Sequence, residues 1–323
     1  MKITVLLPVY NAGAPLKQAI ESILDQEFKE FEFLIIDDSS TDGSTGIVRD
    51  FAGHDPRIRA IFHTSNQGLA KTLNEGLEAA RGELIARMDQ DDEALPHRLK
   101  PQHLFMKTHP EFAVAGSYIF HMGIDKQRDR LVKLPVSHPE IAETLKKENC
   151  LYHPSVIMRR REILDLGGYR SEFKNAEDYD LWLRVSKHYQ LANIPEALIR
   201  YRFSVSGMTL SRKWEQLYYV FLAQVAHEHP GQTNTACEQE ARERLARVDR
   251  PAFMRCVALG TAEELMRLGY LTESLKLLRF FSSEIGGVKT MIIALNLFLK
   301  RRTPKWFSDS HWLCRTLDSI LDR

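Results

Sequence analysis

The sequence has few cysteines, no long hydrophobic run and almost no excess charge of one sign. Four cysteines are spread over 323 residues without a Cys-x-x-Cys pair, which predicts reduced, unpaired thiols in a cytoplasmic protein. No apolar run reaches the length of about 18 residues that a membrane-spanning helix needs. The formal net charge is +1, which argues against a protein that binds nucleic acid through its overall charge.

The chain also lacks the glycine-rich loops that bind phosphates in many nucleotide enzymes. No Gly-x-Gly-x-x-Gly follows the first predicted strand, and Gly-x-x-x-x-Gly-Lys-Ser/Thr occurs nowhere. These absences argue against a dinucleotide-dependent dehydrogenase and against a P-loop ATPase. A diphosphate would instead be held by a metal bound to carboxylates.

Strands and helices alternate through the first quarter of the chain. Apolar runs predict buried strands at 3–9, 31–36, 58–62 and 83–88, and later strands at 112–120, 191–194 and 197–201. Helical spacing of apolar residues predicts amphipathic helices at 16–24 and 69–80. This alternation indicates right-handed βαβ units, so the predicted fold class is α/β with a mostly parallel sheet flanked by helices.

Polar clusters follow three of these strands. They are Tyr10-Asn11, Asp37-Asp38 and Asp89-Gln90-Asp91. Ligands of open parallel sheets bind beyond the carboxyl ends of the strands, where such clusters meet. The sequence therefore predicts a binding site at this edge of the sheet.

The stretch Arg87-Met88-Asp89-Gln90-Asp91-Asp92 concentrates three carboxylates after a short strand. Carboxylates at such short separations raise one another's pKa, and a bound cation relieves their repulsion. Oxygen ligands suit Mg²⁺ and Mn²⁺, which bind through one or two carboxylates and substrate phosphates. The alternative is an acidic turn in which Asp92 caps the next helix.

Four motifs together resemble the bacterial-type family 2 glycosyltransferases. They are Pro8-Val9-Tyr10-Asn11, Asp37-Asp38-Ser39-Ser40-Thr41-Asp42, Asn66-x-Gly68-Leu69 with Asn74, and Gly82-Glu83 before Met88-Asp89-Gln90-Asp91-Asp92. Their order and spacing match over about residues 1–205. The resemblance implies the GT-A fold, an inverting reaction, a nucleotide-diphosphate-sugar donor and Mn²⁺ or Mg²⁺.

The resemblance also implies roles for individual residues. The donor-binding residues would be Pro8, Tyr10, Asn11, Asp38, Lys71 and Asp89, and the metal ligands would be Asp89 and Asp91. Tyr10 and Asp38 would hold the nucleobase. The alternatives are that Tyr10 closes a loop and that Asp38 caps the following helix.

Two positions depart from the family pattern. Many members carry Arg where this chain has Leu73, which leaves Lys71 as the nearest cation for the donor phosphates. Members often place a histidine soon after the Tyr-Arg that corresponds to Tyr201-Arg202, but Phe203-Ser204-Val205-Ser206 follows here. A third protein ligand for the metal is therefore not expected from that segment.

A second acidic motif spans residues 175–184. Its apolar spacing predicts a helix with Glu177 and Asp178 at the N-terminus, where the helix dipole favours negative charge. The Glu-Asp-x-x-Leu-Trp pattern is similar to the catalytic motif of the family, which implies that Asp178 is the general base, with Glu177 as the alternative. His153 lines the acceptor cleft in one interpretation and is structural in the other.

The C-terminal third is predicted to be helical, which divides the chain into regions 1–210 and 211–323. Residues 285–307 contain five basic and no acidic side chains beside Trp306 and Phe307. Such a segment suits an anionic membrane surface, for example the inner face of the plasma membrane, and the alternative is a buried helix with a solvated basic end.

The predicted function is transfer of a hexose or hexosamine from a nucleotide sugar, with UDP favoured because it is the commonest in the family. The acceptor would be a glycan or a lipid-linked glycan of cell-surface polysaccharide or lipopolysaccharide assembly. The alternatives are a sugar nucleotidyltransferase and a non-catalytic scaffold. The first usually needs a basic, glycine-rich loop near the first strand, and the segment from Pro8 to Gly13 has no Lys or Arg.

Overall fold

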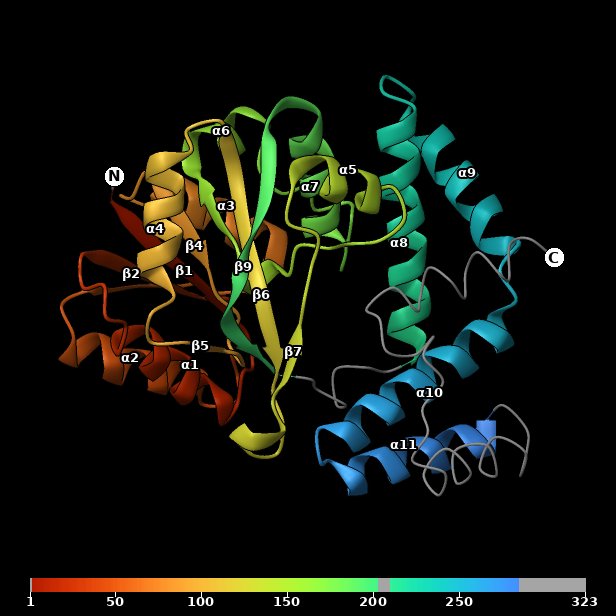
Figure 1. The fold of residues 1–323 in the computed structure, drawn as a ribbon, viewed down its shortest axis with the longest axis horizontal. Helices are drawn as coiled ribbons and strands as arrows, with labels where there is room; N and C mark the ends of the chain where they lie inside the picture. Colours follow the sequence, from red (N-terminus) through yellow and green to blue (C-terminus); the bar gives the residue numbers. More distant parts are fainter. Residues whose placement is uncertain (1, 203–209, 285–323) are drawn as a thin grey trace. The chain divides into compact units, whose positions relative to one another are not determined.

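The computed structural model describes residues 2–202 and 210–284 (Figure 1). Contacts within the chain divide it into two units, of which unit 1 comprises residues 1–120 and 131–202, and unit 2 comprises residues 121–130 and 203–323. The sequence predicts one boundary, at residue 210. The division in the structure falls after Arg202 and also assigns a short internal segment to unit 2.

Four parallel strands form the first half of the sheet in unit 1, in the order β3-β2-β1-β4. The elements are β1 (Ile3–Val9), α1 (Pro15–Leu24), β2 (Phe31–Asp37), α2 (Ser44–His54), β3 (Ile58–Phe62), α3 (Leu69–Ala79) and β4 (Leu84–Arg87). Right-handed crossovers place α1 and α2 on one face and α3 on the other, as Figure 1 shows. The predicted strands and both predicted helices of this half are confirmed.

The second half of the sheet is antiparallel where β8 meets β4 and β6 and where β5 meets β9. Its elements are β5 (Glu93–Ala94), α4 (Leu99–Thr108), β6 (Phe112–His121), η1 (Lys126–Arg128), β7 (Arg130–Val132), α5 (His138–Leu145), η2 (His153–Ser155), β8 (Ile157–Arg159), α6 (Arg160–Asp165), α7 (Glu177–His188) and β9 (Gln190–Tyr201). The two strands predicted near the end of unit 1 are one strand, β9, because exposed Pro195 and Glu196 interrupt its apolar pattern without ending it. The α/β fold class with C-terminal helices is confirmed, but the sheet is mixed rather than mostly parallel, because β8 runs antiparallel to β4 and β6, and β5 runs antiparallel to β9.

Gly82 lies just before β4 and packs against the backbone of β1. A Cβ built on Gly82 would lie 2.5 Å from the amide nitrogen of Thr4. We expect Gly82→Ala to lower the free energy of unfolding by about 1–3 kcal/mol, since a backbone in the middle of a sheet cannot move aside. Gly53→Ala is the matched control, because a Cβ on Gly53 in α2 meets nothing within 4 Å. Urea unfolding of the two variants tests this, and equal effects would contradict it.

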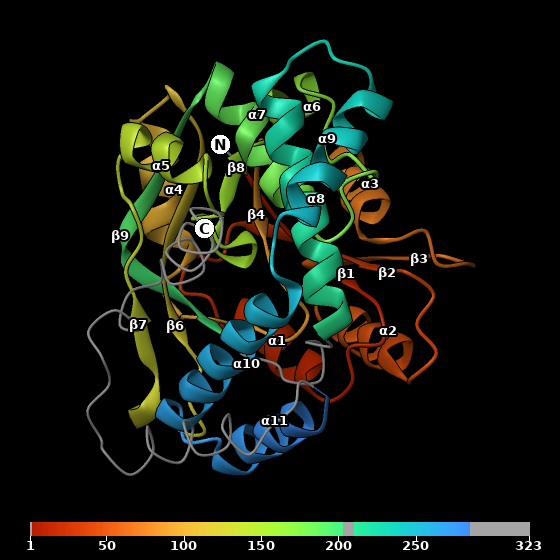
Figure 2. The same ribbon diagram turned by 90° about the vertical axis from the view of Figure 1, so that its right-hand side faces the viewer.

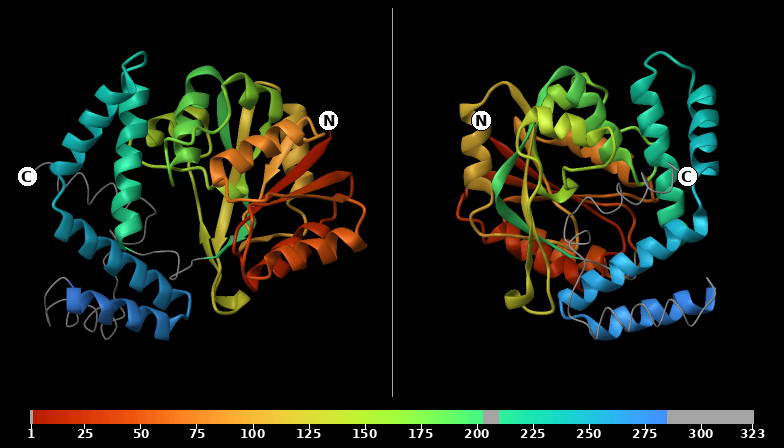
Figure 3. Two further views of the ribbon diagram at one scale, coloured as in Figure 1. Left: turned by 180° about the vertical axis from the view of Figure 1, so that it is seen from behind. Right: turned by 45° about the vertical axis from the view of Figure 1, so that its right-hand side comes forward.

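Unit 2 contains four described α-helices, α8 (Leu210–Glu228), α9 (Asn234–Ala246), α10 (Arg250–Arg267) and α11 (Leu271–Glu284). α8 packs against α9, and α10 packs against α11 (Figures 2 and 3). The internal segment 121–130 joins this unit through Glu264, whose Oε1 lies 2.7 Å from His121 Nδ1 and 2.8 Å from Arg130 Nε. The N–H of Ile124 also donates to the carbonyl of Leu268 at 2.8 Å.

Among residues 2–202 and 210–284, no helix combines the length and the apolar character needed to cross a bilayer. The membrane contact predicted for residues 285–307 lies outside the described residues. Cys150 and Cys237 are buried free thiols, and burial raises the pKa of Cys150 to about 12. Cys150 therefore stays protonated at neutral pH and is a poor nucleophile.

Candidate active site

The ends of β1, β2 and β4 lie side by side at one edge of the sheet. The register pairs Val9 with Asp37 at the end of β2 and Leu6 with Arg87, the last residue of β4. Gln90 joins two of the polar clusters, because its Oε1 accepts from the N–H of Tyr10 at 2.8 Å and its Nε2 donates to the Tyr10 carbonyl at 3.1 Å. The structure thus brings the three predicted clusters together, and Gln90 connects two of them, a role that the sequence analysis did not assign to it.

Asp38 is buried directly after β2 and accepts three hydrogen bonds. Its Oδ1 accepts from the N–H of Gln67 at 2.7 Å and from His63 Nδ1 at 2.7 Å. Its Oδ2 accepts from the N–H of Gly68 at 2.8 Å. Gly68 has a φ of +86°, which explains why a glycine occupies this position. Asp38 makes no capping bond to α2, so the capping alternative is wrong.

The other predicted donor residues have different environments. Tyr10 is 47% exposed, so its ring is open to a stacking partner. The side-chain oxygen of Asn11 accepts from the N–H of Thr41 at 2.7 Å, which leaves its amide N–H groups for a ligand. Pro8 is buried in β1, and Lys71 is exposed at the start of α3 without an ion pair to any described residue.

Three carboxyl groups follow β4 in a confined space. Burial and then the charge of Asp89 raise the pKa of Asp91 to about 6. Burial also raises the pKa of Asp92 well above its ordinary value, and the charges of Asp89 and Asp91 add to this effect. Asp92 Oδ1 accepts from the N–H of Arg202 at 2.7 Å, and α4 begins only at Leu99. The alternative prediction that Asp92 caps this helix is therefore wrong.

Arg87 is a buried cation shared by both acidic motifs. It is 2% exposed and forms an ion pair with Asp89. Burial raises the pKa of the surrounding carboxyl groups, and the charge of Arg87 opposes that rise. The groups concerned are Asp91, Asp92, Glu177 and Asp178. Sequence analysis did not assign a role to Arg87, although a charged residue at the end of a short apolar strand was the available signal.

Arg202 holds the turn that carries the carboxylates. Its Nε donates to the carbonyl of Asp91 at 2.7 Å, and its Nη2 donates to Gln18 Oε1 at 3.0 Å. Together with the bond from its N–H to Asp92, these contacts attach the end of β9 to the turn after β4. The position where family members often have a histidine follows Arg202 and lies outside the described residues.

Asp178 lies in the first turn of α7, which begins at the predicted acidic motif. Its Oδ2 accepts from Asn149 Nδ2 at 2.8 Å, and its Oδ1 accepts from the N–H of Tyr179 at 2.7 Å. Asn149 is itself oriented, because its Oδ1 accepts from the N–H of Leu151 at 3.1 Å. Burial raises the pKa of Asp178 and the two hydrogen bonds oppose the rise. The result is an oriented carboxylate that is more basic than an ordinary aspartate.

Glu177, next to Asp178 in α7, and His153, in η2, are buried groups whose pKa values are shifted in opposite directions. Burial and the charge of Asp178 raise the pKa of Glu177 to about 7. Burial holds the pKa of His153 well below its usual value, so the ring is neutral at pH 7. His153 Nε2 lies 2.8 Å from the hydroxyl of Tyr169, and the ring packs against Trp182. These contacts agree with the structural interpretation of His153.

The residues after β4 fit a hard divalent cation. Asp89 and Asp91 supply carboxylate oxygens, and the Asp89 side chain is 30% exposed and therefore accessible. Burial and the charge of Asp89 raise the pKa of Asp91, and the charge of Arg87 opposes this rise only in part. A bound cation would supply the missing positive charge.

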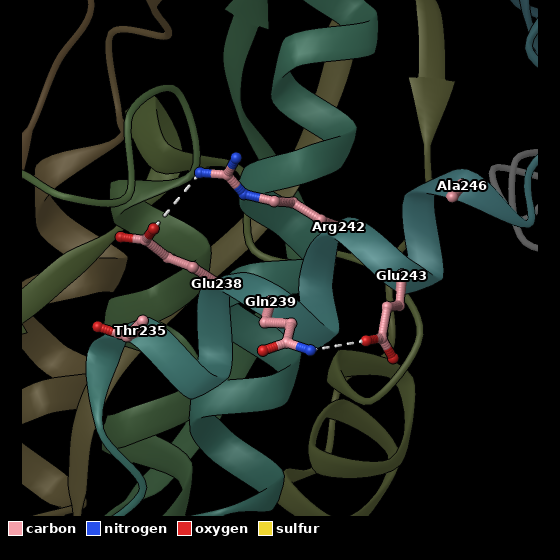
Figure 4. Close-up of a pocket in the computed structure, with 6 residues that line it drawn as sticks. All are labelled: Thr235, Glu238, Gln239, Arg242, Glu243 and Ala246. Atoms are coloured by element: carbon pink, nitrogen blue, oxygen red, sulfur yellow. Dashed lines mark hydrogen bonds and ion pairs between the residues drawn. The ribbon is translucent and has the colours of Figure 1, made fainter.

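Unit 2 has no comparable site among its described residues. A hollow of about 420 Å³ lies on α9 (Figure 4) and is lined by Thr235, Glu238, Gln239, Arg242, Glu243 and Ala246. Within this set, Gln239 bonds to Glu243 and Arg242 bonds to Glu238. A group of potential metal ligands comprises Glu228, His229 and Glu240. Arg244 already bonds the two carboxylates, at 2.5 and 2.7 Å, so this group lacks the surplus charge that surrounds Asp91.

Known proteins share both the sequence pattern and the fold. Residues 4–167 match the profile of "Glycosyl transferase family 2". EpsE of Bacillus subtilis is 35% identical over 205 residues, which cover 62% of this chain and 73% of EpsE. The amylovoran biosynthesis glycosyltransferase AmsE of Erwinia amylovora is 31% identical over 229 residues, which cover 68% of this chain and 85% of AmsE.

Two solved structures show the same fold at low sequence identity. Staphylococcus aureus TarS 1–349 in complex with UDP-GlcNAc has a TM-score of 0.56 and 18% identity, covering 94% of this chain and 93% of TarS 1–349. The Pyrobaculum calidifontis mannosyltransferase in complex with GDP-Man and Mn²⁺ has a TM-score of 0.58 and 16% identity, covering 99% of this chain and 86% of that protein. The resemblance drawn from the motifs is thus confirmed, and the chain belongs to glycosyl transferase family 2, with the GT-A fold.

Proposed function

We propose that this glycosyltransferase moves a sugar from a nucleotide-diphosphate-sugar to an acceptor hydroxyl with inversion at the anomeric carbon. A UDP-sugar is the favoured donor, and a hexose or hexosamine is the sugar. The acceptor is a glycan or lipid-linked glycan of cell-surface polysaccharide or lipopolysaccharide assembly. AmsE, 85% of which is covered by the match, supports the polysaccharide assignment, because its name places it in amylovoran biosynthesis.

One observation carries this proposal. The two acidic motifs are separated by about half of unit 1 in sequence, yet the charge of the buried Arg87 lowers the pKa of carboxyl groups in both, Asp91 in the first and Asp178 in the second. The charge of Asp89 also raises the pKa of Asp178, so the two groups are within electrostatic range of each other. The carboxylates after β4 suit the diphosphate end of the sugar donor. The carboxylates at the start of α7 suit a base that deprotonates the acceptor hydroxyl, and sugar transfer requires both functions.

Asp178 is the general base in this proposal. It takes the proton from the acceptor hydroxyl as the oxygen forms its bond to the anomeric carbon. The bond from that carbon to the diphosphate breaks on the opposite side, and its electron pair leaves with the nucleoside diphosphate. Positive charge that develops at the anomeric carbon resembles that in glycoside hydrolysis. Asn149 and the N–H of Tyr179 keep the carboxylate oriented for this step.

The donor lies along the edge formed by β1, β2 and β4. The ring of Tyr10 stacks on the nucleobase, Asp38 accepts a hydrogen bond from it, and Pro8 and Asn11 border the same position. Lys71 approaches the phosphates from the start of α3. Asp89 and Asp91 would hold Mn²⁺ or Mg²⁺, which when bound neutralises the charge of the departing diphosphate.

Donor hydrolysis tests the function without knowledge of the acceptor. The protein is incubated with UDP-, GDP-, CDP- and dTDP-sugars and Mn²⁺, and free nucleoside diphosphate is measured. We expect slow release from one class of donor, abolished by EDTA and restored by Mn²⁺ or Mg²⁺. NMR of a product formed with a simple glycoside acceptor should show the anomeric configuration opposite to that of the donor. If no nucleotide sugar is hydrolysed or bound, the scaffold alternative replaces this proposal.

A further inference from the structure

Asp38 has little hydrogen-bonding capacity left for a nucleobase. An ionised carboxylate offers about four acceptor positions, two on each oxygen. Oδ1 uses both of its positions on the N–H of Gln67 and on His63. Oδ2 uses one of its positions on the N–H of Gly68. The described contacts therefore leave a single open acceptor position, on Oδ2.

His63 is the side chain that occupies the last position on Oδ1. It lies just after β3, and its side chain is 9% exposed. Nδ1 lies 2.7 Å from Asp38 Oδ1, and Nε2 lies 2.7 Å from Glu75 Oε2. Both ring nitrogens face carboxylate oxygens, and an imidazole can donate from both only when it is protonated. Burial opposes that charge, but the bonds to Asp38 and Glu75 outweigh it and raise the pKa of His63.

We propose that His63 determines nucleobase selectivity by limiting Asp38 to one further hydrogen bond. Uracil presents one imide N–H between two carbonyl groups, which matches a single acceptor. Guanine presents its ring N–H and its amino group side by side, and these bind a carboxylate through both oxygens. With Oδ1 already occupied, the guanine amino group would have no acceptor there, and an unpaired buried donor weakens binding.

This inference rests on the proposed nucleotide-sugar function and deepens it. The two solved structures of the same fold hold different nucleotides, UDP-GlcNAc in one and GDP-Man in the other, at nearly equal TM-scores of 0.56 and 0.58. Overall similarity therefore does not select the base. The surroundings of Asp38 in this chain favour a base with one N–H donor.

The first test uses the unmodified protein and three diphosphates, UDP, IDP and GDP, titrated with Mn²⁺ present. IDP and GDP differ only in the amino group, so their comparison isolates the second donor from the size of a purine. We expect IDP to bind about tenfold more tightly than GDP, because leaving a buried hydrogen-bond donor unpaired costs a factor of about that size. Equal binding of IDP and GDP, or tighter binding of GDP, would overturn the inference.

The second test replaces His63. His63→Ala frees the position on Oδ1, so the preference for IDP over GDP should fall to less than about threefold. His63→Asn retains an N–H donor near the position of Nδ1 and should preserve the preference. Glu75→Gln is the matched control, since it removes the charge on the other side of the ring and leaves the bond to Asp38. An unchanged preference in folded His63→Ala would overturn the inference. If no variant and no wild-type sample binds any nucleotide, the proposed function itself fails.

Discussion

Replacing Asp178 with asparagine should lower the rate of sugar transfer by about 10²–10⁴-fold, the usual contribution of a positioned general base. The amide cannot take the proton of the acceptor hydroxyl, whereas the donor residues at the ends of β1, β2 and β4 are untouched. Nucleotide binding should therefore be preserved. Single-turnover transfer rates, together with titration of UDP in the presence of Mn²⁺, measure the two effects separately.

Two companion variants make this test specific. Asn149→Ala removes the donor that orients Asp178 Oδ2 but leaves the carboxylate, so it should slow transfer much less than Asp178→Asn. Glu177→Gln tests the alternative base directly, because the pKa of Glu177, raised to about 7 by burial and by the charge of Asp178, would also suit a base at neutral pH. If Glu177→Gln abolishes transfer and Asp178→Asn does not, the assignment of the base is reversed.

Asp91→Asn should abolish the metal-dependent stabilisation of the protein by its nucleotide. A ligand present at 100 times its dissociation constant stabilises the folded state by about 2.7 kcal/mol, which thermal melting detects readily. Asp91 supplies one of the two predicted metal ligands, so the Mn²⁺-dependent part of the melting shift should disappear in the variant. A variant that keeps the full shift would show that Asp91 does not bind the metal.

The same substitution should have the opposite effect on the protein without metal. Burial and the charge of Asp89 raise the pKa of Asp91 from 3.8 to about 6. The folded state then holds a proton more tightly than the unfolded state, so this group stabilises the fold below about pH 4 and loses that contribution as the pH rises through 6. In EDTA, Asp91→Asn should therefore melt at a higher temperature than the wild type at pH 7.5.

Asp42 offers a control of opposite sign for this pH effect. Burial opposes ionisation of Asp42, but hydrogen bonds from Ser44 and from the N–H of Gly13 outweigh it and lower its pKa. Its stabilising contribution is present at neutral pH and is lost as the pH falls through the lowered pKa. Asp42→Asn should therefore reduce stability at pH 7.5 under the conditions in which Asp91→Asn increases it. A change of the same sign in both variants would contradict the explanation that burial and the charge of Asp89 destabilise ionised Asp91.

The parallel half of the sheet and its three polar clusters could be predicted from sequence because their causes are local. An apolar run of β-branched residues favours a buried strand, and the carboxyl ends of parallel strands must meet at one edge. The position of Asp178 at the start of a helix was likewise visible in the spacing of Tyr179, Trp182 and Leu183. Each of these predictions needed only neighbouring residues.

The contacts that orient the site carboxylates and shift their pKa values could not be predicted, because the residues that make them are distant in sequence. Asn149 approaches Asp178 from another loop, and His63 reaches Asp38 and Glu75 only after β2 and β3 have paired. From sequence, Arg87 could equally be the solvated end of a strand; the fold buries it and pairs it with Asp89. The alternative that Asp92 caps a helix was wrong for a similar reason, because the N–H of Arg202 at the end of β9 donates to that carboxylate instead.

The assignment of residues 121–130 to unit 2 has a consequence for anyone who shortens this chain. A stop codon after Arg202 would leave that segment in place while deleting Glu264, the partner of His121 and Arg130. His121, which is 7% exposed in the full chain, would lose the surface that covers it. An autonomous version of unit 1 requires two changes, because the chain passes between the two units more than once. The helices of unit 2 must be removed, and the segment 121–130 must be replaced by a short turn.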